Sequence, residues 1–393
     1  SFQSPASYTG EDLIEFACHG GWLVSELVVA ACERGGARRA EAGEFTRRAY
    51  LHGKMDLVQV EAVADLIEAR SRAMHRTALS QMERGLSARV QALRKKIVHV
   101  EALLAHHVDF PEEDDAPVPI DRVMREAGEL VGDIREMLAT APEGELLREG
   151  ALVVFAGRPN AGKSSLYNAL LGEERAIVTE IPGTTRDALE ATVQAGGFPF
   201  RLVDTAGLRD SGDRVEQMGI EVARRYLDGA DVILFCVPAG DDFTDEDRAF
   251  LEETRDAPVV VVRTKADEEG DGAAGDESAP VPNSTDVADR VRVSVESGEG
   301  LGELRALLPR LAYSGLVNAR AEMPVLTRRR QSEALRRACA EVEAFEAGLR
   351  DGLPAEVAAS HLRSAESALE ELLGLVSADD VLDVVFREFC IGK

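Results

Sequence analysis

The chain has 393 residues, 45% of them hydrophobic and 30% charged, and its formal net charge is −26 at pH 7. A chain of this length has room for roughly two or three domains, and so acidic a surface excludes nucleic-acid binding by bulk charge alone. Its five cysteines include no C-x-x-C pair and no apolar run reaches about 18 residues, so we expect reduced thiols, a cytoplasmic protein and no membrane span.

The sequence of residues 1–52 predicts only part of an N-terminal domain. A turn and a strand are expected over 8–16, a helix over 22–32, and an irregular polar stretch over 38–47. The region is short for an independent domain. We therefore expect that the start of this domain is missing, or that its core is completed in an oligomer.

Helical sequence lies on both sides of the middle of the chain. Apolar residues at helical spacing run from 55 to 104 without proline, which predicts one or two long helices, and a further helix is expected over 120–138. Residues 322–393 are helical again. We expect residues 53–146 and 314–393 to form one helical domain that is interrupted by residues 147–313.

The middle of the chain alternates strand and helix patterns. Alternation of this kind predicts an α/β domain with a doubly wound, mostly parallel sheet. An acidic stretch at 268–289 is expected to be a surface insertion. The predicted strands are 151–156, 189–195, 199–204, 230–237, 258–263 and 290–294.

Residues 157–164 read Gly-Arg-Pro-Asn-Ala-Gly-Lys-Ser between a predicted strand and a predicted helix. This is the pattern of a phosphate-binding loop, in which helix N–H groups face the phosphate oxygens. Lys163 is expected to reach the β- and γ-phosphates, and Ser164 to bind Mg²⁺. The loop residues expected to contact the nucleotide are Asn160, Ala161, Gly162, Lys163, Ser164 and Ser165.

Two later segments complete a magnesium and phosphate site. The stretch 181–187 (Ile-Pro-Gly-Thr-Thr-Arg-Asp) has the place of a switch segment, in which Thr184 or, preferably, Thr185 would bind Mg²⁺ and sense the γ-phosphate. Asp204 would hold Mg²⁺ through water, beside Thr205, and the Gly207 N–H would meet the γ-phosphate.

A third pair of segments predicts recognition of guanine. Asp267, in Thr264-Lys265-Ala266-Asp267, can accept the two adjacent N–H donors that guanine has and adenine lacks. The Lys265 stem can lie along the base, and backbone N–H groups at Ser294 and Val295 can support it. In this order along the chain, the motifs predict binding of GTP and GDP at the strand ends of the sheet.

These motifs do not specify which residue positions the attacking water. Leu208 stands where Ras has its water-orienting Gln, and a leucine cannot orient water. Glu216 is the best carboxylate candidate, the alternative being a solvated loop charge. The amide oxygen of Asn160 could bind a monovalent cation beside the phosphates.

Together with these motifs, several further stretches resemble the tRNA-modification GTPase MnmE (TrmE) family over nearly the whole chain. The most specific is the terminal Phe389-Cys390-Ile391-Gly392-Lys393. Thr264 departs from the family, which usually has Asn there, and the 268–289 insertion is also unusual. The other carriers lie at residues 7–12, 19–21, 43–49 and 53–57.

The resemblance implies a homodimer with a potassium-stimulated GTPase whose domains pair across the dimer. It implies Glu216 as the residue that orients the attacking water and Cys390 as a residue at the modification site. It also implies a 5-formyl-tetrahydrofolate-type donor bound by the N-terminal domain and an FAD-dependent partner (MnmG or GidA) for modifying the tRNA wobble uridine. The implied potassium ligands are Asn160, Thr179, Ile181 and Thr184.

Two alternatives remain open from the sequence. One is a ribosome-assembly GTPase switch of the Era/Der kind, which shares the Asn160 and 183–185 features but lacks the flanking helical sequence and the Phe389-Cys390 ending. The other is a folate-binding one-carbon enzyme with a regulatory GTPase attached.

Overall fold

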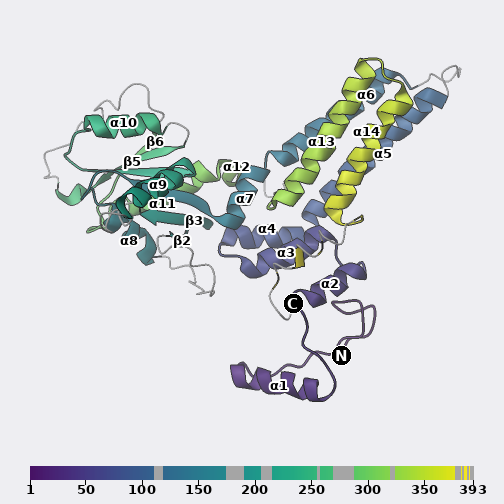
Figure 1. Ribbon diagram of the computed structural model, residues 1–393, viewed down its shortest axis with the longest axis horizontal. Coiled ribbons are helices and arrows are strands. Elements are labelled where there is room, and N and C mark those ends of the chain that lie inside the picture. The colour runs from purple at the N-terminus through teal and green to yellow at the C-terminus, as the bar shows by residue number, and fades with distance from the viewer. Residues whose placement is uncertain are drawn as a thin grey trace. The chain divides into compact units, whose positions relative to one another are not determined.

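The computed structural model divides the chain into two compact units (Figure 1). The helical unit contains residues 1–68, 76–141 and 324–393, and the sheet unit contains residues 69–75 and 142–323. The division expected from the sequence, into 1–52, 53–146 with 314–393, and 147–313, stays a prediction. The structure describes residues 1–109, 118–173, 190–204, 215–254, 257–268, 287–318 and 324–376, and positions 382, 385, 386 and 389.

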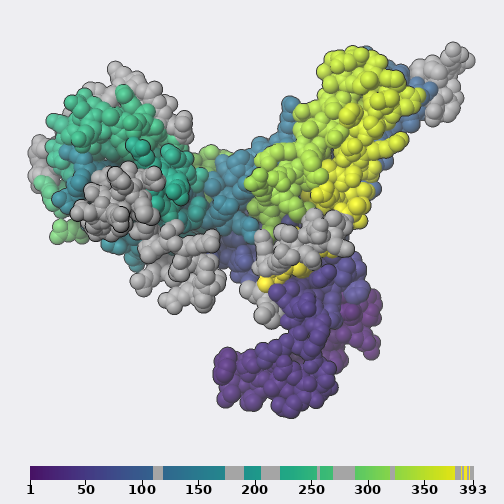
Figure 2. Space-filling model, in the orientation of Figure 1, coloured from purple at the N-terminus to yellow at the C-terminus, as the bar shows by residue number. Residues whose placement is uncertain are grey.

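The helical unit is built on the long helices α5 (Gly85–Asp109), α6 (Ile120–Leu138), α13 (Arg329–Arg350) and α14 (Ala355–Leu373). α13 and α14 run side by side, and both reach the surface in the space-filling view (Figure 1 and Figure 2). Each of these four helices is amphipathic, and their apolar faces meet in one core. Side chains fully buried in it include Ile97, Ile134, Phe345 and Leu369.

The prediction of one or two long helices over residues 55–104 was wrong. The stretch forms α3 (Leu57–Glu68), α4 (Arg72–Met82) and α5. The first break is fixed by Ser71, whose hydroxyl accepts a hydrogen bond from the Met74 N–H and so caps α4. The second break is at Arg84, which has a left-handed φ of 70° that no helix can continue through.

The N-terminal residues form α1 (Trp22–Arg34) and α2 (Glu44–Leu51). Instead of the strand expected over 8–16, the structure has one isolated bridge between Phe2 and Leu13. A strand needs a neighbour to satisfy its backbone groups, and within residues 8–16 the structure gives only Leu13 such a partner. In the described part of the chain, every helix is too short or too polar to cross a membrane.

The sheet unit contains a six-stranded sheet in the order β2-β3-β1-β4-β5-β6. All neighbouring strands are parallel except β2 and β3, so the predicted doubly wound, mostly parallel sheet is confirmed. β1 and β4 are apolar and buried along nearly their whole length, as expected for strands covered on both faces. The strands are β1 (Ala151–Ala156), β2 (Glu190–Ala195), β3 (Phe198–Asp204), β4 (Val232–Pro238), β5 (Val259–Thr264) and β6 (Val287–Arg292).

The carboxyl ends of the parallel strands meet at one edge of the sheet. The chain order reverses at β1, which lies between β3 and β4, and this is the point where doubly wound sheets bind ligands. Asp204 ends β3 and Thr264 ends β5. The helices of this unit are α7 (Ala141–Glu149), α8 (Lys163–Glu173), α9 (Val215–Asp228), α10 (Asp245–Glu253), α11 (Leu301–Ala312) and α12 (Ser314–Asn318), with the 3-10 turn η1 (Ala266–Glu268).

Candidate functional site

The loop between β1 and α8 has the backbone of an anion-binding loop. Gly157, Asn160 and Gly162 all have left-handed φ values, of 129°, 62° and 82°. A Cβ atom on Gly157 would lie 2.3 Å from the Cys236 carbonyl oxygen, so only glycine fits there. The loop therefore packs tightly against β4 and leads directly into the N-terminus of α8, where free N–H groups favour phosphate.

Lys163, the first residue of α8, folds back over this loop. Its side chain is 6% exposed, and its Nζ donates to the carbonyl oxygens of Gly157 (2.9 Å) and Arg158 (2.6 Å). The ammonium group is thus held above the same loop whose N–H groups would face a phosphate. This arrangement suits the charge neutralisation expected of Lys163.

Ser164 and Asp204 bring oxygen ligands together beside the loop. The Ser164 hydroxyl donates to Asp204 Oδ2 at 2.6 Å. The contact follows from the sheet, because β1 and β3 are neighbours and Phe155 is paired with Asp204. Hydroxyl and carboxylate oxygens are the donors that Mg²⁺ prefers, so these two residues fit a magnesium ion.

The predicted base-recognition residues lie at the ends of the next strands. Asp267 Oδ1 accepts a 2.5 Å hydrogen bond from the buried Ser294 hydroxyl, and this bond lowers the pKa of the Asp267 carboxyl. Lys265 adopts a left-handed φ of 57°, which turns the chain sharply after β5. Asp267 is therefore kept ionised and oriented as an acceptor, as recognition of guanine requires.

Thr264 has a role that sequence reasoning missed. Its side chain is 3% exposed, and its hydroxyl donates to the Ala161 carbonyl oxygen at 2.7 Å. A Cβ atom on Gly162 would lie 3.2 Å from Thr264 Cβ, so the two segments are in close contact. The hydroxyl thus ties the phosphate loop to the base-recognition segment. No local pattern could have indicated a contact between residues 103 positions apart.

The structure brings the phosphate loop, Asp204, Thr264, Asp267 and Ser294 to the same edge of the sheet. Glu216 is the second residue of α9, but its side chain lies outside what the structure describes. Ser165 is exposed in the first turn of α8, and Val295 directly follows Ser294. The other predicted residues are not among those described: Thr179, Ile181, Thr184, Thr185, Thr205, Gly207 and Cys390.

Comparison with known proteins decides the family. Residues 1–54 match the family described as "GTP-binding protein TrmE N-terminus", and residues 57–390 match "MnmE helical domain". The tRNA modification GTPase MnmE of Geobacter sulfurreducens is 40% identical over 392 residues, which cover 99% of this chain and 84% of that protein. Its counterpart from Laribacter hongkongensis is 43% identical over 396 residues, covering 100% and 85%.

The chain belongs to the MnmE family of tRNA modification GTPases. It is therefore a GTP hydrolase, as the motifs predicted, and the resemblance inferred from the sequence is confirmed. Among solved structures, a single-residue variant of Aquifex aeolicus Era bound to GDP·AlF4⁻ is 25% identical, covering 48% of this chain and 66% of that one, with a TM-score of 0.34. At that score the likeness decides nothing further about this MnmE chain.

Proposed function

We propose that this MnmE chain is a potassium-stimulated GTPase that works as a homodimer and, with an FAD-dependent partner, installs an aminomethyl-type group on the wobble uridine of tRNA in the cytoplasm. The observation that carries the nucleotide part is the convergence of the phosphate loop, Asp204 and Asp267 at one sheet edge. The chain covers 84% of the Geobacter MnmE relative, and this extent supports transfer of the RNA-modifying role.

In the proposed site, the nucleotide phosphates lie on the loop from Asn160 to Ser165 and the base lies against Asp267. Ser164 and Thr185 would bind Mg²⁺, Asp204 would help to hold it through water, and the Gly207 N–H would meet the γ-phosphate. The hydrogen bond between Ser164 and Asp204 supports the first half of this assignment. Magnesium, when bound, neutralises charge between the β- and γ-phosphates.

Potassium is proposed to bind through Asn160, Thr179, Ile181 and Thr184. Asn160 is exposed at the loop, and asparagine is among the few non-glycine residues that tolerate its left-handed φ of 62°. A cation there would place positive charge where other GTPases use an arginine finger. Two GTPase domains (residues 147–313) paired across the dimer would shield this cation from water.

Potassium stimulation is tested with Asn160→Gly, which keeps the left-handed backbone and removes only the amide side chain. We expect the wild-type chain to hydrolyse GTP faster in K⁺ than in Na⁺ at equal ionic strength, and Asn160→Gly to hydrolyse it equally in both. Asn160→Asp, which retains a side-chain oxygen, is the matched control. Equal wild-type rates in the two salts would remove the potassium assignment.

The RNA-modifying part is proposed to use Cys390 near the modified base and a 5-formyl-tetrahydrofolate-type donor in the N-terminal region. Its test is the fraction of wobble uridine that is modified in tRNA from a strain that lacks this gene, with and without a plasmid copy of the gene. We expect the modification to vanish and to return with the plasmid. Unchanged tRNA together with a ribosome-assembly defect would favour the Era/Der-like switch. Unchanged tRNA with altered one-carbon metabolism would favour the folate enzyme.

A further inference from the structure

The chain passes between the two units at four points, and residues of the helical unit near each point contact or form one short segment, residues 324–328. Near the first passage, after residue 68, Asp65 Oδ2 accepts from the Thr327 hydroxyl at 3.3 Å. Near the second, Gln81 Nε2 donates to the Val325 carbonyl at 2.8 Å. Near the third, Thr140 Oγ1 accepts from the Leu326 N–H at 3.1 Å. The fourth passage, between 323 and 324, begins the segment itself.

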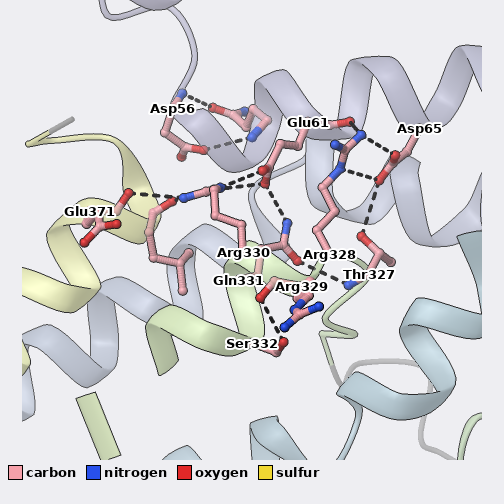
Figure 3. Close-up of polar contacts among 12 residues, drawn as sticks. Asp56, Glu61, Asp65, Thr327, Arg328, Arg329, Arg330, Gln331, Ser332 and Glu371 are labelled. Carbon is pink, nitrogen blue, oxygen red and sulfur yellow. Dashed lines mark hydrogen bonds and ion pairs between the residues drawn. The ribbon is translucent and has the colours of Figure 1, made fainter. Parts of the chain in front are cut away.

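This segment leads into a buried ion-pair cluster between α3 and the start of α13 (Figure 3). Glu61, which is 1% exposed, accepts from Arg330 Nε (2.7 Å), Arg330 Nη2 (3.0 Å) and Gln331 Nε2 (2.8 Å). Asp65 accepts from Arg328 Nη2 at 2.7 Å. A buried ion pair is seldom more stabilising than apolar residues of equal volume, so this cluster is better explained by the geometry that it fixes.

Arg330 also holds the end of α14. Its Nη1 donates to the Glu371 carbonyl (3.2 Å) and its Nη2 to the Leu372 carbonyl (3.1 Å), both in the last turn of the helix. A cation that donates to these carbonyl oxygens is favoured by the helix dipole. One side chain thus joins α3, α13 and the point from which the C-terminal segment leaves α14.

The described residues beyond α14 contact α2 and α3. Gly374, with a left-handed φ of 75°, accepts a 2.5 Å hydrogen bond from the Tyr50 hydroxyl at its carbonyl oxygen. Further on, Phe386 and Phe389 pack with α3 in one apolar cluster, and Phe389 Cβ lies 3.0 Å from the position of a Cβ on Gly43. The α3 members of this cluster are Leu57, Val60 and Ala64. Cys390 follows Phe389 directly in the sequence.

We propose that Arg330, held by Glu61, is a positioning residue that links the chain returning from the sheet unit to the C-terminal segment that ends in Phe389 and Cys390. A displacement of residues 324–328, when the nucleotide state changes, is passed by the ion-pair cluster to the end of α14 and to the α3 surface that holds Phe389. The inference rests on the proposed function, because it explains how GTP hydrolysis acts on the modification site.

The test uses Arg330→Lys, which keeps the charge but cannot reach Glu61 and both α14 carbonyls at once. The readout is the rate at which Cys390 reacts with a maleimide, measured on the C-terminal tryptic peptide by mass spectrometry with GDP and with a non-hydrolysable GTP analogue bound. We expect the two wild-type rates to differ by about fivefold and the two Arg330→Lys rates to be equal. GTP hydrolysis by Arg330→Lys should stay within about twofold of wild type, while tRNA modification falls about tenfold.

The matched control is Arg337→Gln, which removes an exposed ion pair from α13 to the Glu371 side chain, the same residue whose carbonyl Arg330 contacts. This variant should keep the wild-type labelling difference. Tyr50→Phe is a second test that leaves the ion-pair cluster intact, and it should also reduce the difference because it frees Gly374. A structural role alone would lower the melting temperature and leave the labelling difference unchanged.

Two outcomes would overturn the proposal: no nucleotide dependence of labelling in the wild-type chain, or full wild-type dependence in Arg330→Lys. A wild-type chain that labels as expected but modifies no tRNA would contradict the proposed function instead. The labelling and modification assays therefore separate the two ideas.

Discussion

The Ser164 hydroxyl donates a 2.6 Å hydrogen bond to the Asp204 carboxylate, which joins the first turn of α8 to the end of β3. Each residue comes from a different motif, and the two are 40 positions apart. Their meeting is a consequence of the parallel pairing of β1 with β3. In a GTP hydrolase, this pair of oxygen donors is where magnesium is expected.

Ser164→Ala should therefore weaken the magnesium dependence of catalysis. Loss of one direct ligand is expected to reduce kcat for GTP hydrolysis by about 10²-fold and to raise the Mg²⁺ concentration needed for half-maximal rate. The measurement is the GTPase rate over a magnesium titration. Ser165→Ala, which changes the neighbouring exposed hydroxyl and keeps its N–H, is the control. If both variants need the same Mg²⁺ concentration for half-maximal rate, the assignment of Ser164 as a magnesium ligand is incorrect.

Glu216→Ala should leave GTP binding unchanged and lower kcat by about 10²-fold, the scale of losing a positioned catalytic group. The reason is that Leu208 cannot orient water, and Glu216, the second residue of α9, is the first carboxylate in the helix that follows Leu208 along the chain. Single-turnover hydrolysis measures the step directly. Gln217→Ala, which changes the next residue of α9 and leaves the carboxylate in place, serves as the neighbouring control. Wild-type single-turnover rates in Glu216→Ala would refute the role.

Thr264→Val should weaken binding of both GTP and GDP. Valine has nearly the same shape but leaves the Ala161 carbonyl without its hydroxyl donor, which costs about 1–3 kcal/mol at a buried site. Thr264→Ser restores the donor and should bind nearly as the wild type does. Titration calorimetry with GDP compares the three proteins. If Thr264→Val and Thr264→Ser bind GDP with equal affinity, the link between the phosphate loop and the base-recognition segment does not matter for binding.

Tyr313→Phe should destabilise the sheet unit. Tyr313 is fully buried, and its hydroxyl lies within hydrogen-bond distance of the Leu146 and Pro199 carbonyls and accepts from the Ala151 N–H. Removing it takes away the acceptor of the Ala151 N–H at a buried site, which costs about 1–3 kcal/mol in the free energy of unfolding. Urea denaturation checks the value. Tyr226→Phe, which removes a more exposed hydroxyl bonded to Glu190, should cost less than about 0.5 kcal/mol.

Much of the sheet unit could be predicted because its signals are local. The apolar run before residue 157 specifies β1 to the residue, and the helical pattern after residue 163 predicts α8 with ends about two residues from those observed. The contacts that organise the rest are not local. Arg330 contacts Glu61, which is 269 positions away in the sequence. Arg84 has a left-handed φ and ends a helix although the apolar pattern continues past it. Neither follows from periodicity, because each depends on which elements pack together in the folded chain.

The buried Glu61 should make the stability of the helical unit depend on pH. Burial, the largest single influence, would raise the pKa of this carboxyl, but the charge and hydrogen bonds of Arg330, the charge of Arg328 and the hydrogen bond from Gln331 together hold the pKa below its ordinary value of 4.5. Because the folded-state pKa is depressed, the stabilisation is complete above the unfolded-state pKa and is lost as the pH falls through the folded-state pKa. The free energy of unfolding of the wild-type chain should therefore decline below about pH 4.5.

Glu61→Gln should remove this contribution and show a flatter decline over the same range. Near pH 7 it should also be less stable by about 3 kcal/mol, since Arg330 loses its buried counter-charge. Urea unfolding from about pH 7 to about pH 4 measures both effects. Glu371→Gln, which removes the carboxylate of a surface ion pair, should follow the wild-type curve. Parallel pH curves for wild type and Glu61→Gln would show that Glu61 does not titrate with folding, and that the ion pair with Arg330 does not set its ionisation.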